Sequence, residues 1–279
     1  MDALRAWLRG TEARLVGLTL LTKVFLFGWG LLIQSLAQGR PFDLGQILVV
    51  WNRWDAPHYL DLAIWGYMAV DPGVTPTFGQ TGDMDLMIVF YPLFPGAIAT
   101  LLWLVPDLVA PILVNTVALA VAVVLLYRVV ARELGPVIGQ RAAIFMLIFP
   151  TAYFLHIGYT ESLFLALVLG SFLASRSNRW FVAGMLGGLS ALTRVNGLLL
   201  IPSLAADAWT EWRATRRLQL TWGWIGLVAV GFGGYLLLNL FVYGDPFAFL
   251  QIQSEHWFKS FAWPWVGIGG VIDRLGDPN

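Results

Sequence analysis

Apolar runs about as long as a bilayer is thick are the feature that most limits how this chain can fold. A helix needs about 20 mainly apolar residues to cross the hydrocarbon core, and the clearest such runs occupy 15–36, 112–130 and 220–242. Of the 279 residues, 58% are hydrophobic and 12% are charged, whereas about 25% are charged in an average soluble domain. We therefore predict an all-α, multi-pass integral membrane protein that forms a single transmembrane domain over 1–279.

Charge and cysteine content remove several classes of function. Seventeen basic residues balance seventeen acidic ones, so the net charge offers no argument for a nucleic-acid partner, and none is expected. The chain has no cysteine, which removes disulfides, thiolate metal sites and cysteine nucleophiles. The sequence has no other set of metal ligands at a fixed spacing, and we expect neither a metal nor a cofactor.

The first apolar run indicates where the N-terminus lies. Arg5, Arg9 and Arg14 precede it, but no small-residue cleavage pattern follows it. We therefore interpret it as a first membrane span and not as a removed signal peptide. Its N-terminus is then cytoplasmic, and Lys23 lies near enough to the inner end of the span for its amine to reach the headgroups.

The positions of arginine predict the remaining topology. Arg128, Arg132 and Arg141 follow or end the run at 112–130, and the positive-inside rule places them in the cytoplasm. The proline-broken segment 87–105 must then begin and end outside, which favours a shallow or re-entrant helix; the alternative is that it spans and the arginines face out. Residues 37–86 form a long external loop, in which apolar spacing predicts an interfacial helix at about 51–67.

This topology brings polar interruptions of the apolar chain to the non-cytoplasmic face. Ionisable residues held at a membrane are costly and mark functional sites by default. Carboxylates beside an arginine also suit transfer chemistry on an anionic substrate. The interruptions are Asp55/His58/Asp61, Tyr159/Thr160/Glu161, Arg194/Asn196 and Asp245/Glu255/His256.

Asp55 is the candidate general base. Trp51 and Trp54 are expected to wall it, and partial desolvation raises the pKa of a carboxylate towards the range in which it accepts a proton from a hydroxyl. The alternative is that Asp55 caps the helix that follows it. His58 shares its helical face and is either part of the site or a hydrogen-bonded interfacial histidine, while Asp61 is expected to be solvated.

Arg194 is the candidate phosphate ligand, because a guanidinium offers a bidentate fork, and Asn196 lies beside it in the chain. The alternative for Arg194 is a structural ion pair with a carboxylate such as Glu161. Glu161 itself has two interpretations, a catalytic group or an acid that suits the dipole of the helix it begins. Glu255 and His256 are weaker candidates for contact with substrate.

Four motifs in order resemble the signatures of one family. They are WDAPHYL at 54–60 with Ala63 and Gly66-Tyr67, FYPLFP at 90–95, PTAYFL at 150–155 with GYTESLF at 158–164, and LTRVNG at 192–197. Together they are similar to GPI mannosyltransferase II and its prokaryotic relatives, the PIG-V-like family of GT-C glycosyltransferases. The similarity covers 51–197 and continues weakly to about residue 265.

The resemblance implies a GT-C bundle and an inverting transferase that acts on the non-cytoplasmic side of a prokaryotic plasma membrane. Its donor would be a polyprenyl- or dolichyl-phosphate sugar, with mannose expected, and its acceptor a hydroxyl of a glycolipid, a glycan or a protein. Family members continue with further membrane helices, so we expect the C-terminal helices to be lacking here. The implied roles are catalysis by Asp55 and His58, donor-phosphate binding by Arg194 and Asn196, and a substrate pocket of Trp54, Tyr159 and Glu161.

Two other classes fit parts of the pattern. A transporter or flippase-like lipid-binding protein also has broken helices and intramembrane charges, and a non-catalytic subunit can be built on a shortened scaffold of the same kind. A transporter needs polar groups deep in its crossing helices, whereas here they gather at one face. This difference favours the transferase.

Overall fold

The computed structural model describes residues 10–39, 41–67, 84–257 and 262–276, and every regular element within these ranges is helical. Helices long and apolar enough to cross a membrane are α2 (Thr11–Gln38), α5 (Val109–Leu134), and η6 (Leu220–Gly226) continued by α10 (Leu227–Tyr243). They coincide with the three apolar runs of the sequence. α2 ends where Gly39 adopts a left-handed conformation with φ of 59°, a common way to stop a helix.

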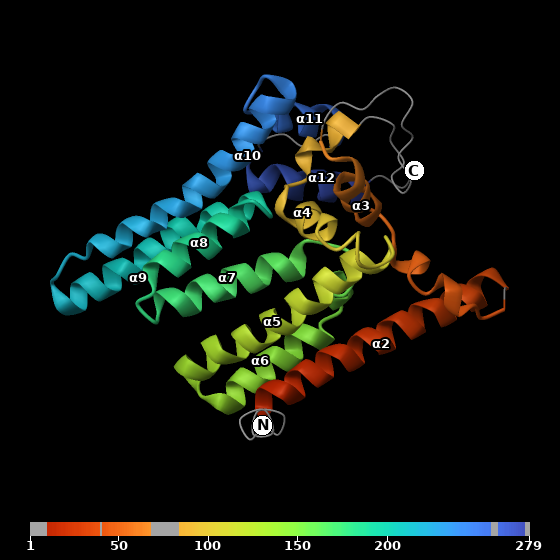
Figure 1. The fold of residues 1–279 in the computed structure, drawn as a ribbon, viewed down its shortest axis with the longest axis horizontal. Helices are drawn as coiled ribbons and strands as arrows, with labels where there is room; N and C mark the ends of the chain where they lie inside the picture. The colour runs from red at the N-terminus through yellow and green to blue at the C-terminus, as the bar shows by residue number, and fades with distance from the viewer. Residues whose placement is uncertain (1–9, 40, 68–83, 258–261, 277–279) are drawn as a thin grey trace.

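Shorter apolar helices complete the bundle. They are α6 (Pro136–Ile148), α7 (Glu161–Ser175), α8 (Trp180–Ala191) and α9 (Leu200–Thr215) (Figure 1). α7 packs between α5 and α8, and α2 packs against α5 and α6. At 15 residues α7 is about 22 Å long, which is less than the roughly 30 Å of a hydrocarbon core. The turn before α7 lies inside the protein, and residues 155–160 are buried along their whole length.

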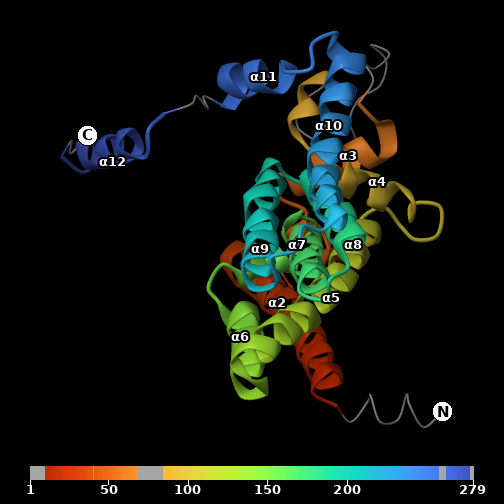
Figure 2. The same ribbon diagram turned by 90° about the vertical axis from the view of Figure 1, so that its left-hand side faces the viewer.

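The two ends of the bundle differ in chemistry. One end, here called the site end, carries α3 (Ala56–Trp65), α4 (Leu93–Ala99) and α11 (Ala248–Trp257) (Figure 1). The other, here called the arginine end, holds ion pairs that tie α5 to α2 and α7 to α5, namely Arg128–Glu12 at 2.7 Å and Arg176–Glu133 at 2.5 Å. Helix α12 (Pro264–Gly276) extends away from the bundle (Figure 2).

The proline-broken segment at 87–105 forms no continuous helix. It consists of η3 (Met84–Val89), α4 and a series of turns. α4 has 7 residues and is therefore about 10 Å long, too short to cross a bilayer. Its buried Phe94 and Ile98 pack in one cluster with Tyr59 and Leu60 of α3. These features support the shallow alternative over a membrane span.

The helix expected at about 51–67 from the spacing of apolar residues is shorter in the structure, where α3 covers Ala56–Trp65. Trp51 ends the turn η2 (Val49–Trp51), which follows η1 (Leu44–Gln46), and Trp54 has φ of 54°. A left-handed conformation is unusual for a bulky residue, and it delays the helix until α3 begins at Ala56. Residues 68–83 of the expected loop at 37–86 lie outside the described residues.

Buried polar side chains of the three long apolar helices form hydrogen bonds with segments at the site end. The Lys23 side chain is buried, and its Nζ donates to the backbone carbonyl of His156 at 2.8 Å. The expectation that Lys23 reaches the headgroups is therefore wrong, because the carbonyl of a segment 133 residues away satisfies the amine. Asn115 Nδ2 donates to the Tyr159 carbonyl at 2.9 Å, and Asn239 Oδ1 accepts from the Phe249 N–H at 3.1 Å. Since a buried polar group is costly unless it is bonded, each bond fixes a segment at the site end.

Glycines bring α8 and α10 into backbone contact. A Cβ atom on Gly231 of α10 would overlap the carbonyl of Gly188 in α8, and one on Gly188 would lie 2.6 Å from the Leu227 carbonyl oxygen. A Cβ on Gly184 would overlap the Trp224 carbonyl in the same way. The glycine-rich run before residue 242 therefore does allow close approach, as its composition predicted. Open space surrounds Gly223, Gly226 and Gly233.

Candidate functional site

A polar cavity at the site end joins three segments of the chain. Its volume is about 510 Å³, and it is bounded by the turn before α3, by η4 (Ala152–Leu155) and by the first turns of α7. Three of the four predicted polar groups contribute side chains to this cavity or to the layer directly behind it. The lining residues are Trp54, Asp55, Tyr153, Phe154, Tyr159 and Glu161.

Asp55 lies at the junction of α3 and the cavity. It occupies the cap position of α3, but its side chain makes no capping hydrogen bond. Its backbone N–H donates to the Tyr159 hydroxyl at 3.0 Å, which holds the α3 turn against the segment before α7. Asp55 is exposed, and Trp51 lines a neighbouring groove instead of this cavity. The expected tryptophan wall is therefore wrong in part: Trp54 is present, while the other aromatic walls come from η4.

Tyr159 is held from both sides. Asn115 binds its carbonyl, its ring lies 5.4 Å from that of Phe154, and its hydroxyl accepts from Asp55. Burial, together with the nearby charges of Asp55 and Glu161, raises the pKa of Tyr159 to about 12. The phenol therefore keeps its proton at neutral pH and lines the cavity beside Asp55.

Arg194 and Glu161 form an ion pair behind the cavity. Arg194 Nη1 donates to Glu161 Oε1 at 2.5 Å and to Thr160 Oγ1 at 3.0 Å. Burial disfavours the charge of Arg194, but the pKa is raised overall because Glu161 and the neighbouring Tyr59 and Asp55 more than offset that cost. This contact agrees with the alternative interpretation of Arg194, a structural ion pair with Glu161. Glu161 lines the cavity, whereas Arg194 does not.

Only one of the two carboxylate oxygens of Glu161 takes part in this ion pair. Glu161 Oε2 is buried and has no hydrogen-bond partner among the described residues. A buried acceptor left in this way carries a desolvation cost. Within the part of the chain that the structure describes, the side chain of Glu161 is therefore held through one oxygen only, and the other oxygen is buried without a hydrogen bond.

His58 and Asp61, the other two candidate residues in α3, lie on the side of the helix that packs against the protein. The His58 ring is half-buried with its centroid 5.5 Å from that of Phe90, and it does not line the cavity. Burial lowers the pKa of His58 below its usual value, although the charges of Asp55 and Asp61 oppose this. The imidazole is accordingly neutral at pH 7. Asp61 is 1% exposed, so the expectation of a solvated carboxylate is wrong, because α3 buries this face as well as its apolar one.

Asn196 and the fourth predicted group do not reach the cavity in the described part of the chain. Asn196 is exposed and does not line the cavity. In the fourth group, Asp245 accepts from the Phe247 N–H at 2.8 Å, and Glu255 accepts from Gln251 at 2.9 Å. These contacts lie within α11 and its approach, so the convergence holds for three groups and not for the fourth.

Tyr153 and Phe154 are cavity residues that sequence reasoning did not assign. They follow Pro150 in the PTAYFL motif, which was the available signal. Their rings are tilted by 32° to each other with centroids 4.0 Å apart, and the Trp54 ring lies 6.4 Å from that of Tyr153 and 6.5 Å from that of Phe154. The three rings form an aromatic wall of the cavity that Asp55 and Glu161 also line, an arrangement suited to a ligand with both apolar and hydroxyl-bearing surfaces.

An apolar groove of about 550 Å³ adjoins the cavity and shares Trp54 and Tyr153 with it. The groove runs between α2 and α6, where Phe25 and Ile148 are 64% and 60% exposed. Polar cavity and apolar groove therefore have a common wall, which is the geometry that an amphiphilic ligand requires. The groove is lined by Thr22, Phe25, Leu26, Trp51, Trp54, Leu147, Ile148, Phe149, Pro150, Ala152 and Tyr153.

Neither a metal cluster nor a known relative narrows the function further. Within the described ranges, no three His, Cys, Asp or Glu side chains are grouped so that they would hold a metal ion. No protein-family model, curated protein or solved structure matches this chain.

Proposed function

We propose that this protein is an inverting glycosyltransferase. Its donor is a polyprenyl-phosphate-linked sugar, with mannose as the expected sugar, and its acceptor is a hydroxyl presented at the non-cytoplasmic membrane face. The observation that carries the proposal is the shared wall of the cavity and the groove. A lipid-linked sugar has both parts, an isoprenoid chain for the apolar groove and a phosphate sugar for the polar cavity.

Asp55 supplies the base that this reaction needs. The acceptor oxygen attacks the anomeric carbon, a new glycosidic C–O bond forms, and the bond from that carbon to the phosphate oxygen breaks. The bonding pair leaves with the lipid phosphate, while the Asp55 carboxylate takes the proton of the acceptor hydroxyl. An exposed carboxylate in the cavity lining can reach that hydroxyl, and the protonated Tyr159 beside it offers a hydrogen-bond donor to substrate oxygens.

The buried polar groups of the spanning helices argue against a transporter. Lys23, Asn115 and Asn239 each bind a backbone group of a segment at the site end. A transport path needs polar groups that line a route through the bundle, whereas these three side chains are occupied by hydrogen bonds that hold neighbouring segments in place. A lipid-binding subunit without catalysis would share the groove, and loss of transfer on removal of Asp55 distinguishes it from an enzyme.

Donor binding is expected to depend on the groove as well as on the cavity. A sugar on geranyl phosphate should bind at least about tenfold more weakly than the same sugar on undecaprenyl phosphate, because each buried CH₂ contributes about 0.8 kcal/mol. Leu26→Trp, which fills the groove, should remove that difference. The measurement is equilibrium binding of a fluorescent polyprenyl-phosphate mannose to the purified protein.

The control is Val24→Trp, which adds the same ring at a position on α2 that is 70% exposed and outside the groove. It should leave the chain-length preference intact. Equal binding of short and long donors by the unaltered protein would exclude the groove as the donor site, and so would equal effects of the two tryptophans.

Arg194→Ala is expected to weaken donor binding by about tenfold or more. Arg194 lies behind the cavity lining, so a donor phosphate must displace Glu161 from it and thereby exchanges one charged hydrogen bond for another. Loss of a charged hydrogen bond costs about 1.5–3 kcal/mol. Glu161→Gln is the matched variant, because it removes the competing charge and keeps the shape of the side chain. It should preserve donor binding or tighten it. A donor affinity that is unchanged in Arg194→Ala would return Arg194 to a structural role.

A further inference from the structure

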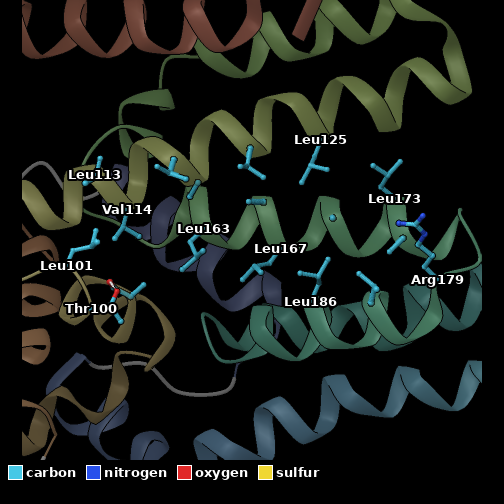
Figure 3. A pocket seen from close by; sticks show the side chains of 18 of the residues that line it. Thr100, Leu101, Leu113, Val114, Leu125, Leu163, Leu167, Leu173, Arg179 and Leu186 are labelled. Carbon is cyan, nitrogen blue, oxygen red and sulfur yellow. Dashed lines mark hydrogen bonds between the residues drawn. The ribbon is translucent and has the colours of Figure 1, made fainter. Parts of the chain in front are cut away.

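A second and larger apolar groove lies on another face of the bundle. Its volume is about 850 Å³, and it runs between α5 on one side and α7 and α8 on the other, with the end of α4 at one extremity (Figure 3). Among its lining residues, Val117 and Val121 are 58% and 45% exposed. The groove is therefore open along its length and not a closed cavity inside the bundle.

The length of this groove matches one leaflet of a bilayer. On α5 the lining extends from Leu113 to Leu125, which is about 18 Å at 1.5 Å per residue. One leaflet contributes about half of a hydrocarbon core that is roughly 30 Å thick. An acyl chain anchored at one membrane surface therefore fits the groove from end to end.

The two ends of the groove differ in charge. Thr100 and Leu101 lie at the extremity near α4, and Arg179 lies at the opposite extremity, at the arginine end (Figure 3). Ser177 also lines the groove. Arg179 is exposed, and its guanidinium forms no ion pair or hydrogen bond within the described residues. Its neighbours there are occupied: Arg176 pairs with Glu133, and Arg132 donates to the Arg176 carbonyl and to Ser177.

We propose that this groove holds one acyl chain of an anionic phospholipid whose phosphate pairs with Arg179. The apolar lining accepts the chain, and the single guanidinium at the mouth supplies the complementary charge that selects an anionic headgroup. The site lies at the arginine end and is separate from the cavity of Asp55, so it does not depend on the proposed glycosyltransferase activity.

Native mass spectrometry of the purified protein in detergent micelles tests this site. With added phosphatidylglycerol, one lipid should remain bound at energies that strip phosphatidylcholine. Arg179→Ala should weaken phosphatidylglycerol binding by about tenfold or more, as expected for loss of a charged hydrogen bond, and should weaken phosphatidylcholine binding less, because the choline cation already offsets the phosphate charge of that lipid. Arg213→Ala is the matched control, because Arg213 is also exposed at the end of its helix but does not line the groove.

Val121→Trp tests the chain-binding part by placing a ring in the groove. It should abolish retention of phosphatidylglycerol, while Ile138→Trp, on a 45% exposed position of α6 outside the groove, should not. If Val121→Trp fails to fold, Val117→Phe makes the same test with a smaller ring. The proposal is overturned if the two phospholipids are retained equally, if Arg213→Ala acts like Arg179→Ala, or if the folded groove variants retain phosphatidylglycerol.

Discussion

Asp55→Asn is expected to abolish sugar transfer, lowering the rate by at least about a hundredfold, the lower end of what a positioned general base contributes. The amide has nearly the same shape but cannot take the proton of an acceptor hydroxyl. Donor binding should survive, because the backbone N–H that bonds Tyr159 and the walls of the cavity are unchanged. The measurement is mass spectrometry of lipid-linked sugars and glycoconjugates in cells that lack the protein and are complemented with each variant.

Asp245→Asn is the control for this experiment. Asp245 belongs to a predicted polar group, but its carboxylate accepts from the Phe247 N–H and does not line the cavity. An asparagine there still accepts that bond, so transfer should be normal. Undiminished transfer by Asp55→Asn would remove Asp55 as the base. Equal loss in both variants would point to expression or folding and would count against a specific role for Asp55.

The parts of the fold that follow from run length and spacing were predictable. The three long apolar runs became α2, α5 and the helix over Leu220–Tyr243. Polar residues that interrupt an apolar chain are costly wherever they lie, so Asp55, Tyr159 and Glu161 were recognisable as members of a site. Their meeting in one cavity follows from the turns before α3 and α7, which lie at the same end of the bundle.

Choices of partner were not predictable, because they depend on contacts between distant segments. The sequence around Lys23 suits an amine that reaches headgroups, and nothing local indicates that the carbonyl of His156 lies within 2.8 Å. The same holds for Arg194, whose bond to Glu161 spans 33 residues and was one of two open interpretations. Tyr153 was overlooked for another reason: aromatic residues are common at membrane interfaces, so its presence alone does not indicate a cavity.

Gly231→Ala is expected to destabilise the protein by about 1–3 kcal/mol, the usual cost of overpacking. The new methyl would overlap the carbonyl of Gly188, so α10 must move away from α8. Gly233→Ala is the matched control on the same helix. No atom lies within 4 Å of the Cβ it would add, and replacing a helical glycine by alanine then stabilises by about 0.5–1 kcal/mol. Thermal unfolding of the purified proteins in detergent measures both changes.

The same contact links the bundle to the candidate site. The Leu192 carbonyl, just beyond the end of α8, accepts from the Leu93 N–H at the start of α4 at 3.0 Å, and Arg194 follows two residues later. Displacing α8 therefore shifts both α4 and the guanidinium that bonds Glu161. We expect Gly231→Ala to weaken donor binding together with stability, whereas Gly233→Ala should leave binding unchanged. If the two variants lose stability equally, glycine is needed in α10 for a reason other than the backbone contact. If Gly231→Ala loses stability but binds donor normally, the position of α8 does not control the site.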